Sequence, residues 1–183
     1  ADVFIHSWNT EFEDLLVDLY KPKKHIVEKQ IIFDENSINK NSIPSRWWSN
    51  SVVMNLKRQY EEENNFKYDW VMLYRFDHVF LVNLNFSKFN NDKIYFRHSN
   101  GMRAPQKGAH GVRLFDAFTF SNSINMDKFA SVYEWHQEKN EQFSVGPHDE
   151  CYMQLKRNNL QDNLDFAFYG YDPHASNSGY NIM

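Results

Sequence analysis

The sequence lacks several features that define common classes of protein. It has one cysteine, Cys151, so it can form neither an intramolecular disulfide nor a cysteine-rich zinc site, and a reducing, cytoplasmic location is the simpler expectation. No apolar run approaches the roughly 20 residues that span a bilayer, which predicts no transmembrane segment. The net charge is −4. This argues against a general nucleic-acid or anionic-membrane binder, because such binding needs a basic surface.

The signature motifs of several enzyme classes are also missing. The sequence has no GxGxxG or GxxxxGK[ST] loop, no GxSxG elbow, no HExxH helix and no set of protein-kinase motifs. The sequence therefore lacks the main evidence that would assign it to the dinucleotide-dependent enzymes, the P-loop enzymes or the α/β-hydrolases.

Aromatic residues are the feature that is plentiful. The chain has 183 residues, of which 16 are Phe, 10 Tyr and 5 Trp. The length predicts one domain over residues 1–183. Most of these rings, Trp47 and Trp48 among them, fall on the faces of predicted helices and strands, so we assign them to the core before any role in stacking on sugars.

Hydrophobic periodicity and turn residues predict strands and helices in alternation. The expected strands are residues 1–6, 25–33, 68–74, 80–84, 93–96, 115–120 and 164–169. The expected helices run from a capping box at Asn9 or Thr10 to Lys21-Pro22 and over 45–65, 125–143 and 147–159, with loops at 34–45 and 99–111. Residues 68–74 (YDWVMLY) are nearly all apolar, which predicts a central strand buried on both faces. The alternation favours an α/β fold with a mixed sheet.

The first candidate site is Arg75-Phe76-Asp77-His78, which follows that strand directly. Ligands of open α/β sheets bind beyond the carboxyl ends of the strands. Asp77 could hold a divalent cation through its carboxylate, and Arg75 could neutralise a phosphate as a planar fork. The structural alternative is an Arg-Asp pair on the surface.

The second candidate is His148-Asp149-Glu150, at the predicted start of a helix after Gly146-Pro147. A carboxylate at this place can act as a general base toward a sugar hydroxyl. The structural alternative is simple favourable placement of acids at a helix N-terminus.

Three further groups are weaker candidates. His174, on a late polar segment, could complete a metal site or be an ordinary surface residue. His6, Trp8 and Asn9 follow the first strand, where a base or ribose could be held. Asp116 lies within the apolar strand 115–120, where a buried acid would need a partner or a role.

Six segments resemble, in order, a known family. DVFIHSWN, YKPKKHIVEKQ, SRWWS, YDWVMLYRFDHVF, FTFSNSINMDKF and HDECYMQL are similar to segments of the nucleotide-sugar glycosyltransferases of the GT-A fold found in bacteria and large viruses. YDWVMLYRFD is the most specific, since members of the family carry YDxVxxxRxD there. The resemblance implies a mixed, mostly parallel central sheet flanked by helices. It also implies transfer of a sugar from a nucleotide diphosphate donor to a hydroxyl of a glycan or other acceptor, with Mn²⁺ or Mg²⁺.

The resemblance also assigns roles to residues. Arg75-Phe76-Asp77 matches the metal-binding Asp-x-Asp motif with Arg in the first acidic position, so Asp77 is the implied metal-facing acid and Arg75 could itself offset the charge of the diphosphate. His174 matches a late histidine that completes the metal site in some of these enzymes. Glu150, or Asp149, matches the acid that deprotonates the acceptor in inverting members, with Glu150 narrowly preferred.

Members of the family have a strand ahead of the one that matches DVFIHSWN, so the resemblance predicts that this chain is truncated at its N-terminus and that donor binding is weakened or lost. Two other functions stay open. A non-catalytic carbohydrate-binding protein would use the aromatic residues as stacking platforms. A metal-dependent hydrolase or nuclease would use the carboxylates and histidines, and the acidic composition disfavours it.

Overall fold

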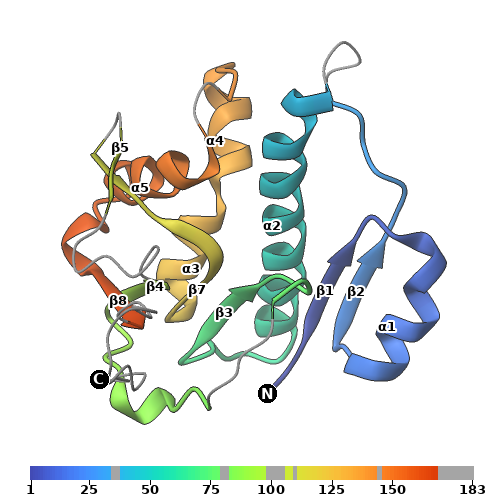
Figure 1. The fold of residues 1–183 in the computed structure, drawn as a ribbon. Helices are drawn as coiled ribbons and strands as arrows, with labels where there is room; N and C mark the ends of the chain where they lie inside the picture. Colours follow the sequence, from blue (N-terminus) through green and yellow to red (C-terminus); the bar gives the residue numbers. More distant parts are fainter. Residues whose placement is uncertain (34–37, 79–82, 98–105, 109–110, 144–145, 169–183) are drawn as a thin grey trace, which may run out of the picture. The chain divides into compact units, whose positions relative to one another are not determined.

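The computed structural model describes residues 1–33, 38–78, 83–97, 106–108, 111–143 and 146–168. Within these ranges the chain is a mixed α/β protein, as the alternation of patterns predicts. It divides into two compact units (Figure 1). The first contains the described parts of Ala1–Lys67 and Ala130–Ser144, and the second those of Tyr68–Phe129 and Val145–Met183. None of the described helices is long and apolar enough to cross a membrane.

The first unit begins with a strand, a helix and a second, parallel strand (Figure 1). β1 (Phe4–Ser7) pairs with β2 (Lys24–Val27), and a short 3₁₀ turn, η1 (Thr10–Phe12), leads into α1 (Glu13–Tyr20) between them. Lys21 ends α1 in the left-handed conformation at φ 45°, and its amide donates to the carbonyl of Val17 at 2.9 Å. The predicted end of this helix is therefore confirmed, whereas the second strand is shorter than predicted.

The start of α1 differs from the prediction. Asn9 precedes η1 without a side-chain capping bond, and its own amide donates to the hydroxyl of Ser7 at 3.1 Å, so no capping box forms. The apolar side chains of Phe12, Leu15 and Leu19 are exposed. The periodicity placed these side chains on one face correctly, but that face is not covered by the described residues.

The long helix α2 (Ile38–Glu63) packs on β1 and β2 and on α4 (Val132–Lys139). It begins seven residues before the predicted helix, so the expected loop 34–45 is wrong from residue 38 onward. Pro44 lies inside α2, and proline is a residue that ordinarily marks a helix boundary. Trp47 is fully buried, which confirms its predicted place in the core, and Trp48 is partly buried.

The second unit is built on a four-stranded sheet in the order β3-β7-β4-β8. The strands are β3 (Val71–Tyr74), β4 (Ile94–Arg97), β7 (Phe115–Ser121) and β8 (Leu164–Phe168). β7 runs antiparallel to both β3 and β4, and only β4 and β8 are parallel. The described strands therefore form a mixed sheet, and a predominance of parallel pairing is not seen among them.

The prediction that residues 68–74 form a central strand is wrong. β3 covers only the last four of these residues, pairs with β7 alone and lies at one edge of the described sheet. Its side chains are half-buried, and that of Tyr74 is exposed. The apolar run has another cause, because Trp70 packs its ring on Phe86 and Phe120 at centroid distances of 5.2 and 5.8 Å.

One face of this sheet is covered by aromatic side chains from neighbouring loops. Tyr95, Phe118, Phe120 and Ala167 form the buried cluster, and Trp70, Phe86, Phe89 and Phe115 are among the partly buried residues that pack on it. Phe86 belongs to a 3₁₀ turn, η2 (Phe86–Lys88). The assignment of the aromatic residues to the core is confirmed for these rings.

The remaining elements complete or correct the prediction. The helix expected over 125–143 is two helices, α3 (Ser123–Ala130) and α4, separated at Ser131. The expected loop 99–111 contains a short strand, β5 (Gln106–Gly108), which pairs antiparallel with β6 (Gly111–Arg113), a strand that begins at the last residue of that loop. α5 (Pro147–Arg157) and a 3₁₀ turn, η3 (Gln161–Asn163), precede β8. Residues 80–82 of the expected strand 80–84, and all of the late segment 170–183, lie outside the described residues.

Candidate functional site

Arg75, Asp77 and His78 form a chain of polar contacts just beyond the carboxyl end of β3. Arg75 donates from Nε and from a terminal nitrogen to the two carboxylate oxygens of Asp77, at 2.9 and 2.5 Å. Nδ1 of His78 lies 2.9 Å from Oδ1 of Asp77. The bond from Arg75 is the main reason why the pKa of Asp77 falls from 3.8 to about 2. Both Arg75 and Asp77 are more than half exposed, so the pair faces solvent.

Phe115, the first residue of β7, joins this group to others from different elements. β3 and β4 both run antiparallel to β7, and Tyr74 pairs with Phe118 and Arg97 with Phe115. The first residues of β7 therefore lie at the end of the sheet where β3 and β4 terminate. The guanidinium carbon of Arg97 lies over the Phe115 ring at 5.1 Å from its centroid, and the His78 ring approaches edge-on at 6.4 Å. The ring of His148, from the first turn of α5, stacks on Phe115 at 5.7 Å. We call this set the Phe115 cluster; it consists of Arg75, Asp77, His78, Arg97, Phe115 and His148.

Two hydrogen bonds between His148 and the backbone of Leu114 tie the start of α5 to the residue before β7. The amide of Leu114 donates to the carbonyl of His148 at 3.1 Å, and Nδ1 of His148 donates back to the carbonyl of Leu114 at 3.0 Å. Because the carbonyl oxygen only accepts, the ring carries its proton on Nδ1 in this contact. These bonds fix the first turn of α5 beside the Phe115 cluster.

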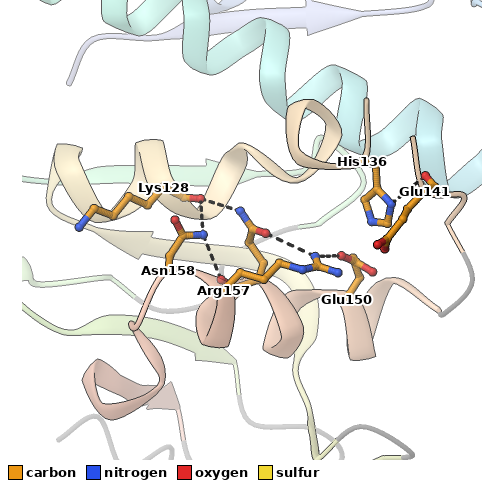
Figure 2. A network of polar contacts seen from close by, with 7 residues as sticks. Lys128, His136, Glu141, Glu150, Arg157 and Asn158 are labelled. Atoms are coloured by element: carbon orange, nitrogen blue, oxygen red, sulfur yellow. Dashed lines mark hydrogen bonds and ion pairs between the residues drawn. The ribbon is translucent and has the colours of Figure 1, made fainter. Parts of the chain in front are cut away.

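Asp149 and Glu150, the two candidate bases, have different surroundings. Oδ2 of Asp149 lies 3.6 Å from Nε of Arg113, while its Oδ1 is buried and has no hydrogen-bond partner among the described residues. The side chain of Asp149 is 15% exposed, against 1% for Glu150. Glu150 accepts a hydrogen bond from Arg157, which extends back along α5 toward it in Figure 2. The geometry therefore favours Asp149 over the preferred Glu150 as the acid that can meet a ligand.

The Glu150 bond belongs to a network that anchors α5 within the second unit (Figure 2). The side-chain nitrogens of Gln154 and Asn158 donate to the backbone carbonyl of Lys128, at 2.8 and 3.3 Å. These contacts join α5 to α3. Glu150 therefore has a structural partner that its place in the sequence does not show.

His6 and Trp8 belong to a separate group in the first unit, at the carboxyl ends of β1 and β2. Nε2 of His6 and Nε1 of Trp48 lie 3.1 and 3.3 Å from the same Glu28 oxygen, Oε1. The His6 and Trp8 rings meet edge-to-face at 4.6 Å. The His6 side chain is 1% exposed, and its Nδ1 is buried without a hydrogen-bond partner in the part of the chain that the structure describes. Burial lowers the pKa of His6 from 6.5, although the contact with Glu28 acts to raise it.

The predicted site residues are thus divided between the two units, each of which we describe by itself. The second unit brings Arg75, Asp77 and Asp149 to one edge of its sheet. Asp116 lies in β7 next to Phe115, and the structure describes only its backbone. Asn9 follows His6 and Trp8 in the first unit. His174 lies outside the described residues.

Sequence reasoning missed Arg97, Phe115, Arg113 and Glu28 as site residues. The rule that found Arg75 and Asp77 also applies to Arg97, since Arg97 follows the expected strand 93–96. What it could not supply was the pairing of that strand, and of β3, with β7.

The described side chains do not fit a site for Mn²⁺ or Mg²⁺. Such ions take several oxygen ligands, whereas both oxygens of Asp77 accept hydrogen bonds from Arg75. A cation bound there would have to displace a guanidinium and a histidine. Among the described residues there is no group of three or more His, Cys, Asp or Glu side chains that could hold a metal ion. The metal ion implied by the resemblance stays a prediction, and the predicted ligand His174 is not described.

Comparisons of the chain with family models, with curated proteins and with solved structures give no match. A function for this protein must therefore be argued from the residues that the fold brings together. The Phe115 cluster and the start of α5 are the two groups of residues on which a function can be based.

Proposed function

We propose that this chain is a glycosyltransferase that moves a sugar from a nucleotide diphosphate donor to a hydroxyl acceptor, on a GT-A-like fold. The observation that carries the proposal is the meeting of two predicted motifs at one sheet edge. Arg75-Phe76-Asp77 follows β3, His148-Asp149 lies in the first turn of α5, and the ring of Phe115 contacts the rings of both His78 and His148. A cationic group and a carboxylate brought to the same end of one sheet suit a reaction in which an anion departs and a hydroxyl is deprotonated.

The proposed division of labour follows from the surroundings of each group. Asp149 takes the proton of the acceptor hydroxyl. The acceptor oxygen then forms a bond to the anomeric carbon of the sugar, and the bond from that carbon to the phosphate oxygen breaks. The electron pair leaves with the nucleotide diphosphate, and the guanidinium of Arg75 stabilises the negative charge that develops there. Glu150, buried against Arg157, serves as a positioning residue for the first turn of α5.

Two exposed rings support a carbohydrate-binding protein as the second candidate. Tyr74 and Phe76 flank Arg75, and both side chains are exposed. Exposed aromatic faces beside polar groups bind sugars by stacking in the absence of any chemistry. In the transferase the same rings would contact the base or the sugar of the donor, so exposure alone does not separate the two functions.

Binding and turnover of a panel of nucleotide sugars test the proposal. We expect one of the UDP, GDP or dTDP sugars to raise the melting temperature of the full chain and to be consumed when sugar acceptors are added. Removal of a general base typically costs about 10²- to 10⁴-fold in rate, so Asp149→Asn should lose turnover to that extent and keep binding. Asp162→Asn, an exposed carboxylate in η3, is the matched control. Stabilisation by free sugars alone, with no turnover of any donor, would favour the carbohydrate-binding protein.

A further inference from the structure

The strongest unassigned feature is Arg97, which ends β4, on the opposite side of β7 from β3 and the predicted motif. We propose that Arg75 and Arg97 together bind the diphosphate group directly, so that the anion is held without a divalent cation. This inference rests on the proposed function and deepens it, because it names how the leaving group is held. Arg97 is not part of the predicted motif and was not expected at the site.

Arg75 is oriented for an anion by its own partner. Asp77 occupies Nε and one terminal nitrogen. An arginine has five N–H donors in a planar fork, so the outer edge of the guanidinium keeps donors for a second acceptor. The side chain is about half exposed, at 51%. Asp77 thus fixes the plane of Arg75 and leaves its solvent-facing edge for a phosphate.

Arg97 contributes a positive charge that no described carboxylate balances. It is exposed and lies over the ring of Phe115. Within the part of the chain that the structure describes, no carboxylate pairs with it, whereas Arg75 pairs with Asp77 and Arg113 with Asp149. A guanidinium stacked on a ring keeps its edge donors free for a planar, bidentate contact with phosphate oxygens.

The sheet places the two arginines within reach of one anion. Arg75 follows β3 and Arg97 ends β4, and both strands are direct neighbours of β7. Strands in a sheet lie about 4.8 Å apart, so β3 and β4 are separated by roughly 10 Å. Contacts also run without a break from Arg75 through Asp77, His78 and Phe115 to Arg97. Two long side chains from the strands that flank β7 can therefore converge on a diphosphate.

The same cluster is poorly suited to a metal-bridged diphosphate. A divalent cation needs oxygen ligands that are not already engaged, and the cluster offers the described carboxylate of Asp77, which is held by Arg75 and His78. Arginine is always protonated and supplies positive charge without a metal. The Arg in the first position of the predicted metal motif is then the functional residue, and Asp77 is its positioning residue.

Calorimetric titration of the full chain with inorganic pyrophosphate and with UDP, GDP and dTDP tests the inference. We expect binding in EDTA that Mn²⁺ does not strengthen. Arg97→Met should weaken it by roughly 10- to 100-fold, as expected for the loss of a charge-assisted hydrogen bond. Lys88→Met, which removes an exposed cation in η2 of the same unit, is the control and should leave the affinity unchanged. Circular dichroism establishes that each variant is folded.

The outcomes separate this inference from the proposed function. Binding that requires Mn²⁺, or that is unchanged in Arg97→Met, overturns the inference even if sugar transfer is observed. Pyrophosphate binding in EDTA that depends on Arg97, with no turnover of any nucleotide sugar, supports the anion site and overturns the transferase. An Arg75→Met variant adds an independent check, because it should weaken binding and also raise the pKa of Asp77.

Discussion

Arg157 donates a hydrogen bond to the carboxylate of Glu150, seven residues earlier in α5 and therefore two turns away on the same face of the helix. The Glu150 side chain is 1% exposed. A carboxylate with this partner and this burial holds α5 together instead of facing an acceptor. The neighbouring Asp149, whose Oδ1 has no partner within the described ranges, is left as the acid that can accept a proton.

Glu150→Ala should therefore destabilise the fold. Removing one partner of a buried ion pair commonly costs about 3–5 kcal/mol, and since Arg157 keeps some exposure, at 15%, we expect the lower end, about 3 kcal/mol. Urea denaturation measures the change in free energy of unfolding. Asp149→Ala is the matched control and should cost less, because its ion pair with Arg113 is longer, at 3.6 Å, and Arg113 is 43% exposed. Equal losses in the two variants would contradict the assignment of roles.

Asp77 should titrate well below an ordinary aspartate. Its hydrogen bonds from Arg75 set a pKa of about 2 in the folded state, and NMR of the carboxyl carbon measures it. Because the folded pKa is depressed, the pair stabilises the fold above about pH 4, and this contribution is lost as the pH falls toward 2. The pair is exposed, so the contribution is only about 0.2–1 kcal/mol. Arg75→Ala should return the pKa toward 3.8, and a value near 4 in the unmodified chain would contradict the bidentate contact.

His6 should make the stability of the first unit depend on pH. Burial lowers its folded pKa below 6.5, so between the two values the unfolded chain binds more protons than the folded one. The contribution of His6 to the free energy of unfolding is therefore fully present above about pH 6.5 and is lost as the pH drops toward the folded pKa. Urea denaturation at pH 7.5 and pH 5.5 measures the difference.

The control for His6 is a second histidine of the same small sheet. His6→Gln should reduce the loss of stability between pH 7.5 and 5.5, whereas His25→Gln, which removes a side chain at 34% exposure, should leave most of that loss in place. If the two substitutions act equally, burial of His6 is not the cause of the pH dependence.

Local pattern predicted the elements well where they depend on neighbouring residues. The end of α1 at Lys21, the α5 start at Pro147 and the strands β4, β7 and β8 all follow from turn residues and periodicity. The edge position of β3 could not be predicted, because an apolar run is the same whether neighbouring strands or packed rings such as Trp70 bury it. The start of α2 was missed because Pro44 locally indicates a boundary.

Only part of the site was predicted, and the rest was missed for a related reason. Strand ends indicated Arg75 and Asp77, but only the antiparallel pairing of β7 with β3 and β4 brings Phe115 and Arg97 to the same edge. Asp149 and Glu150 are adjacent on a helix and point about 100° apart. Which of them is buried is decided by Arg157, and its contact with Glu150 arises two turns further along the helix.

Phe115→Leu should separate the role of Phe115 in the site from its role in the core. The substitution keeps an apolar side chain but removes the ring that lies under Arg97 and beside His78 and His148. Ring contacts of these kinds are each worth about 0.5–1.5 kcal/mol, so we expect stability to fall by about 1–2 kcal/mol. Phe89→Leu is the matched control, since Phe89 packs on the same core through Tyr95 and Phe120, at 4.9 and 5.2 Å. Both variants should lose similar stability in urea, but only Phe115→Leu should lose affinity for pyrophosphate, because only there does Arg97 lose its support. Equal affinity in the two variants would mean that Phe115 packs the core without positioning the arginine.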